Sequence, residues 1–175
     1  MIKICTLYCK QDYQKLYKTW IESLNFSSLI CSACSFHGGC SRHAFYKRMI
    51  ITEDGKKEMR ILRVECSHCH ATHALLPNWI VPYSQHLIVD QIEMIRSFES
   101  GTTPHLITPS NPEINIWSII YITKQYQYHW QERLLAMKAS VFDETDQLIE
   151  TCFTSYNRQF MQIKKTRNLL FLPTT

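Results

Sequence analysis

Two short cysteine pairs constrain the fold of this chain more than any other feature of its sequence. Each pair is a Cys-x-x-Cys motif: Cys31 and Cys34 form the first, and Cys66 and Cys69 form the second. A Cys-x-x-Cys turn presents two sulfur atoms on one side, and four thiolates match the tetrahedral coordination that zinc prefers. Because four thiolates leave no open coordination position, we expect one structural Zn²⁺ ion rather than a catalytic one.

Other interpretations of the cysteines remain open at this point. Redox motifs would need a βαβ setting and a helix N-terminus that lowers a thiol pKa, and the surrounding pattern indicates neither. Free, buried cysteines are the second alternative. A nearby histidine could also replace one cysteine, or Cys40 and His43 could join Cys5 and Cys9 in a second metal site. We favour the interpretation that these residues, with His37, His68, His70 and His73, belong to knuckle loops and the surface.

The segment between the cysteine pairs predicts a β-hairpin. Residues 44–52 and 57–65 are rich in β-branched and aromatic side chains, and Glu53-Asp54-Gly55-Lys56 lies between them. Asp-Gly between two such runs is typical of a type I′ turn, whose two central residues need positive φ. We therefore expect Asp54 and Gly55 at the centre of the turn.

The rest of the chain has the periodicity of helices. Apolar residues three and four positions apart predict an amphipathic helix over residues 12–26. A second helix is expected from Ser84, as N-cap, to Ser100, with Gly101 just past its end. A third should begin at Asn111-Pro112, with Trp117 and Tyr121 in its apolar stripe. After a break near residues 125–127, a fourth helix is expected over residues 128–140, and a last one over residues 143–166.

These elements predict an α+β protein, mainly α. Its expected parts are an N-terminal helix (1–27), a zinc ribbon (28–82), a helix-turn-helix-like helical domain (83–140), and a C-terminal helix with a tail (141–175). The last helix carries apolar residues at alternating spacings of four and three, which is typical of a packing strut or a dimer seam. Oligomerisation through this helix is therefore possible, and the apolar tail should dock against the body.

The charge pattern suggests a nucleic-acid partner. The formal net charge is +4, which is compatible with such a partner. Basic residues concentrate in the hairpin, where they would contact phosphates: Arg42, Lys47, Arg48, Lys56, Lys57, Arg60 and Arg63. In a helix-turn-helix the last helix would enter the major groove. Its expected contacts with base edges come from Tyr128, His129, Gln131, Glu132 and Arg133.

One stretch of sequence resembles a known family. The run Thr72-His73-Ala74-Leu75-Leu76-Pro77, followed by Val81-Pro82-Tyr83, resembles the zinc-ribbon front end of bacterial insertion-sequence transposases. It is also similar to short bacterial zinc-ribbon proteins that are associated with mobile elements, and the region from Phe160 to Pro173 resembles their C-terminus. The likeness covers roughly residues 28–140. In the transposases, the ribbon and a following helix-turn-helix bind the terminal repeats of the element.

The same resemblance marks a departure. Those transposases carry a downstream nuclease domain with three metal-binding carboxylates, whereas this chain stops at Thr175. Asp143, Glu144, Asp146 and Glu150 lie on one expected helix and are too close together to form such a triad. We therefore expect a non-enzymatic DNA-binding protein that serves as an accessory factor or regulator of a transposase or recombinase.

Two further functions remain open. A protein–protein adaptor could dock on a larger nucleoprotein complex, and the basic hairpin could bind RNA instead of DNA. The sequence contains no apolar run of the roughly 18–20 residues that a membrane span needs, and no signal peptide is evident. We expect a cytoplasmic, bacterial protein without a membrane partner, associated with the nucleoid if it is bound to DNA.

Overall fold

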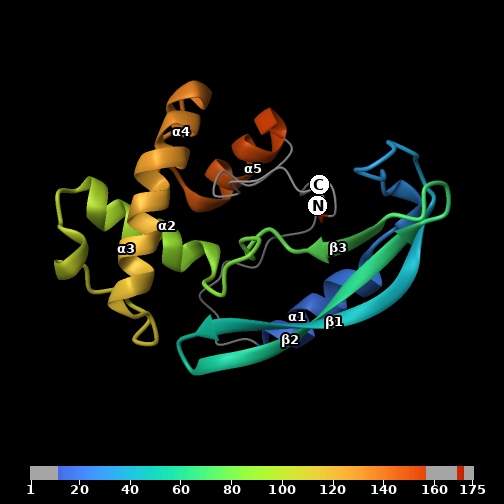
Figure 1. The fold of residues 1–175 in the computed structure, drawn as a ribbon, viewed down its shortest axis with the longest axis horizontal. Coiled ribbons are helices and arrows are strands. Elements are labelled where there is room, and N and C mark those ends of the chain that lie inside the picture. The colour runs from blue at the N-terminus through green and yellow to red at the C-terminus, as the bar shows by residue number, and fades with distance from the viewer. Residues whose placement is uncertain (1–11, 157–168, 172–175) are drawn as a thin grey trace.

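A long antiparallel hairpin forms most of the β part of the molecule (Figure 1). The computed structural model describes residues 12–156 and 169–171 and has a mixed α and β fold. Strands β1 (Cys40–Thr52) and β2 (Gly55–Cys66) pair along their whole length, and β2 also pairs antiparallel with β3 (Thr72–Leu76). Strand β4 (Leu169–Phe171) adds to β3 in parallel, so the C-terminal tail does return to the body, as expected. The sheet order is β1-β2-β3-β4.

The hairpin is confirmed, but its turn is not the expected type I′ turn. Thr52 pairs with Gly55, so Glu53 and Asp54 occupy the two central positions. Neither of these residues has positive φ, whereas Gly55 has φ of 103°. The Asp-Gly signal therefore marks a glycine that follows the turn, in a conformation that glycine adopts without steric cost.

Helix α1 (Tyr13–Ser23) closes the point where β2 and β3 separate. Its N-cap is Asp12, whose carboxylate accepts hydrogen bonds from the backbone N–H groups of Gln14 and Lys15. The predicted helix over residues 12–26 is thus confirmed at its start. The β2–β3 ladder ends at Arg63 and Ala74. In the next position the Tyr17 hydroxyl accepts from the Leu62 N–H at 2.9 Å and donates to the Leu75 carbonyl at 3.0 Å. A side chain thus replaces the missing ladder bond.

The helical part contains α2 (Ile88–Glu99), α3 (Ile116–Gln125), α4 (Gln131–Met137) and α5 (Thr145–Tyr156). Short 3₁₀ turns lie at Phe26–Ser28 and Pro104–Leu106. The expected end of α2 is confirmed: Gly101 has φ of 93°, and the Thr102 N–H donates to the Ser97 carbonyl. Among the described residues, no helix has the length and apolar character needed to cross a membrane.

Two helix starts differ from the expectation. Helix α2 begins at Ile88 rather than after Ser84, and the Ser84 hydroxyl instead accepts from His86 N in the preceding loop and from Gln91 Nε2 of α2. Helix α3 begins at Ile116, with Asn115 as its N-cap. The expected cap, Asn111, donates instead to the buried carboxylate of Asp90 at 3.2 Å.

The expected break near residues 125–127 is a π-helical turn and not a loop. Residues Tyr126–Trp130 form this turn, and helical backbone continues through it from α3 into α4. Its wider turn changes the phase of the helix, so Tyr126, Trp130 and Leu134 are buried at spacings of four. The turn that the helix-turn-helix interpretation places near residues 125–127 is therefore absent from this helix.

The same helix presents a different face than expected. Trp117 and Tyr121 were expected in the apolar stripe, yet they are 75% and 58% exposed. Ile119 and Ile122 are buried in their place. The pattern predicted the wrong face because apolar residues lie on several sides of the helix between Ile116 and Ile122. Packing against α2 determines which of them are buried.

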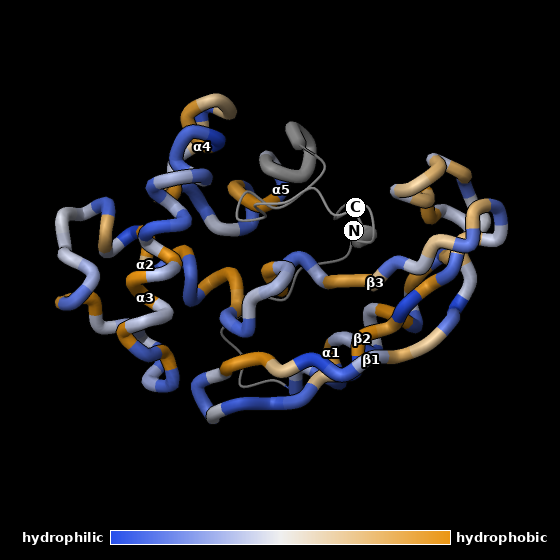
Figure 2. Tube along the Cα trace, viewed as in Figure 1, coloured by the Kyte–Doolittle hydropathy of each residue, from blue (hydrophilic) through white to orange (hydrophobic). Residues whose placement is uncertain are grey.

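One hydrophobic core connects the ribbon to the helices. Buried residues form a single cluster that runs from Tyr17 on α1, through Ile61 and Leu75 in the sheet, to Ile92 on α2 and Ile149 on α5. In Figure 2 the apolar stretches of β3 and α2 lie toward the middle of the molecule, while much of the hairpin is hydrophilic. The loop of residues 77–87 joins the two parts, and its Gln85 carbonyl accepts from the Ile51 N–H of β1.

Replacing Tyr17 with phenylalanine should destabilise the fold. The variant keeps the buried ring but leaves the Leu62 N–H and the Leu75 carbonyl without their partner, at a cost of about 1–3 kcal/mol. Chemical denaturation would measure this loss in the free energy of unfolding. Tyr121→Phe, at an exposed position, is the matched control and should change stability by less than about 0.5 kcal/mol. Equal stability of the two variants would contradict the role given to the Tyr17 hydroxyl.

Candidate functional site

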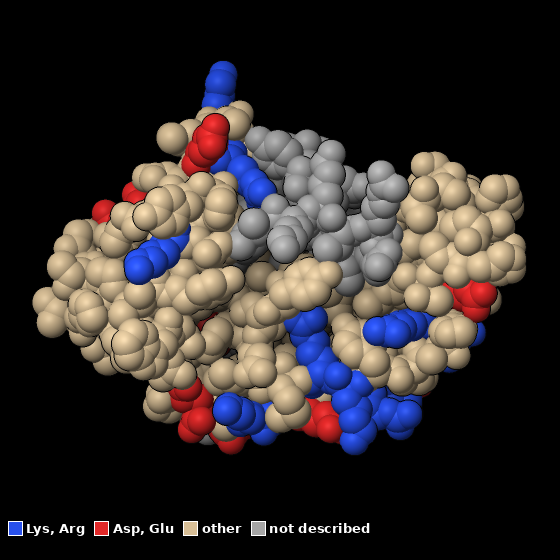
Figure 3. Space-filling model, in the orientation of Figure 1, with Lys and Arg blue, Asp and Glu red and all other residues tan. Residues whose placement is uncertain are grey.

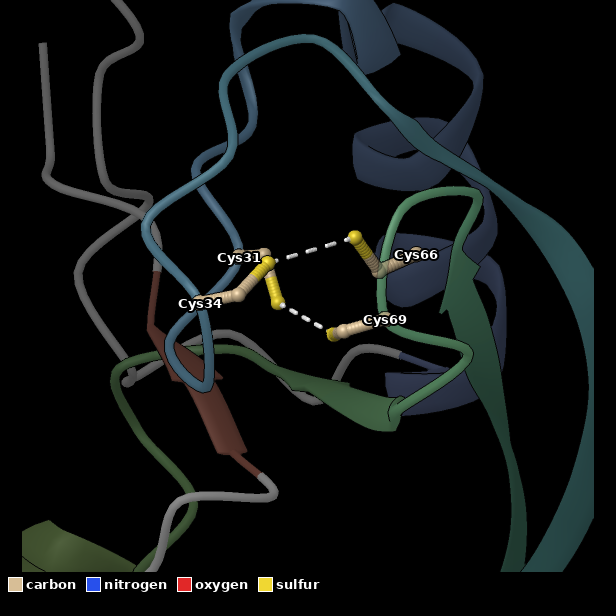
Figure 4. A group of neighbouring side chains, drawn as sticks. All are labelled: Cys31, Cys34, Cys66 and Cys69. Carbon is tan, nitrogen blue, oxygen red and sulfur yellow. Dashed lines mark hydrogen bonds between the residues drawn. The ribbon is translucent and has the colours of Figure 1, made fainter.

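Four cysteine side chains meet at the end of the sheet opposite the hairpin turn (Figure 4). The sulfur atoms of Cys31, Cys34, Cys66 and Cys69 all lie within 4.8 Å of one another. Cys31 Sγ is 3.6 Å from Cys69 Sγ, and Cys34 Sγ is 3.8 Å from Cys66 Sγ. Four sulfurs at 2.3 Å from a central zinc would be about 3.8 Å apart, so these separations are those of a tetrahedral thiolate site. The cluster can hold one metal ion.

The two cysteine turns have the same backbone geometry. In the first, Cys31 N donates to Phe36 O and Ser35 N donates to Cys31 O. In the second, the equivalent bonds run from Cys66 N to Ala71 O and from His70 N to Cys66 O. Ser35 and His70 both have positive φ, at 60° and 56°. Each pair thus lies in a tight turn that directs both sulfur atoms toward the centre of the cluster.

Direct contacts hold the two turns together. The Ser67 N–H of the second turn donates to the Gly39 carbonyl, and the rings of Phe36 and His68 stack with centroids 5.1 Å apart. A Cβ atom at Gly39 would lie 2.4 Å from the Phe36 ring and 2.9 Å from Ser67 Oγ. A side chain at this position would therefore have to displace the Phe36 ring and the Ser67 hydroxyl group, and with them the stacking between the two turns.

The thiols of the cluster cannot all ionise without a cation. The backbone N–H groups of Cys69 and His68 donate to Cys66 and lower its pKa to about 7, despite its burial. The Phe36 N–H lowers the pKa of Cys34, but burial and the neighbouring thiols raise it to about 12. A bound cation would favour the thiolate form of all four groups.

His73 is a partner of the site that sequence reasoning missed. It was expected at the surface, yet it is fully buried on β3, with Nε2 3.2 Å from Cys31 Sγ and Nδ1 3.3 Å from Ser32 Oγ. Because a metal-bound thiolate only accepts, we assign the proton to Nε2. The sequence carried no alternation that could have revealed this contact, because His73, Ala74, Leu75 and Leu76 are all buried on a strand with neighbours on both sides.

The other candidate ligands lie outside the cluster. Cys40 is buried beside it, where burial raises its pKa to about 11. His43 and His70 each contact Glu65, at 2.9 Å and 3.2 Å, near the surface. Cys5 and Cys9, and with them the possible second site, lie outside the described residues.

The basic residues of the hairpin divide between its two faces. Paired residues of an antiparallel ladder project to the same side. The first face, here called the Lys47 face, consists of Arg42, Phe45, Lys47, Lys56 and Arg60. The opposite face carries Tyr46, Arg48, Lys57 and Arg63. Figure 3 shows Lys and Arg side chains gathered over the region of the hairpin, with acidic side chains next to some of them.

Several of these cations are held over aromatic rings. The guanidinium of Arg42 lies 5.2 Å from the Phe26 ring, that of Arg60 5.3 Å from Phe45, and that of Arg63 4.9 Å from Tyr46. All three arginines are exposed, and no ion pair involves them among the residues described. Such stacking positions a cation without neutralising its charge.

The remaining predicted contacts in the hairpin have other partners. Arg48 is half-buried, and its guanidinium donates to the carbonyls of Val81 and Ser84, both at 2.7 Å. These two hydrogen bonds connect the loop of residues 77–87 to the sheet. Lys47 pairs with Glu58 at 3.1 Å and Lys57 with Asp54 at 2.8 Å. Exposed pairs of this kind are weak and exchange readily with other anions.

The predicted base-reading residues lie on the π-helical turn and on α4. Tyr128 and His129 are exposed on the π-helical turn, whereas Gln131 and Arg133 are half-buried on α4. Gln131 Nε2 lies 3.4 Å from Glu99 Oε1 of α2. Glu132 is exposed among them. These residues are thus divided between the surface and the contact with α2.

Part of the chain matches a known family model. A family model described as a domain of unknown function (DUF6431) matches residues 31–117. The matched region begins at the first metal-site cysteine and ends in α3, so it contains both cysteine turns, the hairpin and α2. No curated protein and no solved structure matches the chain.

Replacing Cys66 with serine should abolish metal binding. The change removes one of four ligands at a fully buried position, and we expect less than one equivalent of bound metal and loss of the cooperative unfolding of the ribbon. Elemental analysis and thermal unfolding would measure both effects. Cys40→Ala, beside the cluster but outside it, is the control and should retain the metal. One full equivalent in the Cys66→Ser protein would exclude this ligand set.

Replacing His73 with leucine should weaken the metal site without dismantling it. The variant keeps a buried side chain but loses the donor to Cys31 Sγ, and loss of such outer contacts lowers metal affinity by about 10–100-fold. Competition with a chelator would measure the affinity. His37→Leu, at an exposed position, is the control. If both variants release metal as the unmodified protein does, His73 has only a packing role.

Proposed function

We propose that this chain is a non-enzymatic DNA-binding protein in which a zinc ribbon presents a basic hairpin to DNA phosphates. The observation that carries the proposal is the Lys47 face, where exposed arginines lie over aromatic rings next to exposed lysines. Such groups neutralise phosphates and release counterions, which gives largely sequence-independent affinity.

Zinc is the metal that best fits the cysteine cluster. Four thiolates with tetrahedral separations suit zinc, and a closed set of four protein ligands suits a structural role. In this proposal the ion does no chemistry. It fixes the ends of β1 and β2, where Cys40 pairs with Cys66, and so holds the hairpin at a defined angle to the helices.

The resemblance to the front end of insertion-sequence transposases supports a mobile-element origin. We propose that the chain acts as an accessory factor or regulator of a transposase or recombinase. The helix-turn-helix part of that resemblance does not contribute, because α3 and α4 are continuous through the π-helical turn. The proposed contact with DNA therefore depends on the ribbon alone.

A second candidate function is supported by a different surface. Trp117, Tyr121 and Tyr128 are all more than half exposed on the continuous helix from α3 through the π-helical turn. Large exposed aromatics of this kind are typical of protein–protein interfaces. A protein adaptor that docks on a nucleoprotein complex through this helix is the alternative proposal.

Removing single cations from the Lys47 face should weaken DNA binding and reduce its dependence on salt. For a labelled duplex that carries an element end, Arg60→Ala and Lys56→Ala should each lower the slope of log affinity against log salt concentration by about 1. Fluorescence anisotropy at several salt concentrations would measure the slope. Lys124→Ala, an exposed lysine on α3, is the matched control and should leave the slope unchanged.

Two outcomes would contradict the proposal. The first is absent or salt-insensitive binding of the unmodified protein at low ionic strength. The second is an equal effect of Lys124→Ala and the hairpin variants. Co-purification with a protein partner that depends on Trp117, without binding to DNA, would support the adaptor instead.

A further inference from the structure

A groove on the second face of the hairpin is separate from the Lys47 face. It has a volume of about 380 Å³, near the lower end of the range of small-ligand pockets. Its floor is the sheet, and one wall is the loop that follows β3. The side chains that line it are Tyr46, Arg48, Arg63, Thr72, Ala74, Leu76, Pro82 and Tyr83. We call it the Tyr46 groove.

The groove combines positive charge with aromatic surface. Its lining contains two arginines and no carboxylate. Arg63 lies over the Tyr46 ring and is exposed, while Arg48 is fixed by the carbonyls of the loop. Thr72 adds a hydroxyl group at the same level of the sheet, because it pairs with Glu65 next to Arg63. The charge of this lining suits an anionic ligand such as a phosphodiester.

The exposed ring of Tyr83 indicates that the ligand also has a flat, aromatic part. Its side chain is 80% exposed at the edge of the groove, and its backbone has φ of 62°. A non-glycine residue at such φ is uncommon and costs free energy, and exposing an aromatic ring to water costs more. The fold therefore keeps this ring exposed despite two unfavourable terms. Packing of the core does not require it there.

An exposed ring beside an arginine discriminates between forms of DNA. In a duplex the bases are stacked on each other, so phosphates reach the cations but no base face reaches the ring. In a single strand, a base can stack on an aromatic ring while its phosphate pairs with a cation, which is worth about 1–3 kcal/mol per base. The Lys47 face would contact phosphates only, whereas the Tyr46 groove could also stack an unpaired base.

We propose that the Tyr46 groove binds unpaired nucleotides of DNA, with a base stacked on Tyr83 and its phosphate beside Arg63. This inference rests on the proposed function and adds its substrate form: DNA with a single-stranded segment. Duplex DNA would contact the Lys47 face, and a strand that leaves the duplex would pass to the opposite face of the same hairpin.

Tyr83→Ala in the full, metal-loaded chain tests this assignment. The probes are a labelled 12-nucleotide oligothymidine and the duplex of the same length, measured by fluorescence anisotropy. Tyr83→Ala should weaken binding to the single strand about 5–150-fold, the range that corresponds to loss of one stacked base, and change duplex binding less than twofold. Alanine also needs positive φ at this position, so the backbone cost is the same in both proteins.

Two controls separate stacking from other effects. Tyr83→Phe keeps the ring and should bind the single strand like the unmodified protein. Tyr121→Ala removes a comparably exposed ring outside the groove and should have no effect. If Tyr83→Ala does not fold, Arg63→Gln at an exposed position of β2 serves instead and should also weaken single-strand binding selectively.

The outcomes distinguish the groove from the broader function. Duplex binding with single-strand binding that is insensitive to Tyr83 and Arg63 would overturn the groove alone. A Tyr83→Phe protein that loses as much affinity as Tyr83→Ala would also overturn the stacking role. Absence of any DNA binding by the unmodified protein would refute the proposed function, and the groove inference with it.

Discussion

The convergence of four cysteine sulfur atoms at one end of the sheet is the constraint on which the ribbon depends. Two tight turns bring Cys31, Cys34, Cys66 and Cys69 to separations at which four thiolate charges would repel one another strongly unless a cation lay between them. The turns are themselves slightly strained, since Ser35 and His70 occupy a backbone region that favours glycine. A bound metal ion would offset both costs, and its binding free energy would then be part of the folding free energy.

The cysteine turns lie at one end of the sheet, and they set the alignment of the strands as far as the other end. The cysteine turns fix where β1 starts and β2 ends, and the continuous pairing of these strands carries that alignment to the turn at Gly55. There the loop of residues 77–87 bonds back to β1, and the same loop leads into α2. The Tyr17 hydroxyl secures the place where the sheet splits. The proposed DNA contacts therefore lie on a surface whose geometry is set by the metal site and maintained by a shared core.

Local signals in the sequence predicted much of this arrangement. The cysteine spacing identified the four side chains that cluster, Asp-Gly marked the hairpin, and Gly101 marked the end of α2, because each depends on the chemistry of a few neighbouring residues. The failures concern long-range packing. His73 became part of the metal site through strand pairing, and Trp117 points outward because α2 covers a different side of α3. The π-helical turn has the periodicity of two helices in different phases, which pattern alone does not distinguish from a break.

The position of β1 at the edge of the described sheet gives its charges a second consequence. This strand has 13 residues, and its outer side is bridged at Ile51 by the loop of residues 77–87 but has no strand partner among the described residues, so another chain could add a strand there. Cationic side chains such as Arg42 and Lys47, and the irregular register between Arg42 and Ala44, oppose such pairing. The residues that would attract a polyanion thus also protect the protein from self-association, so neutralising them to weaken DNA binding should make the protein more prone to aggregate.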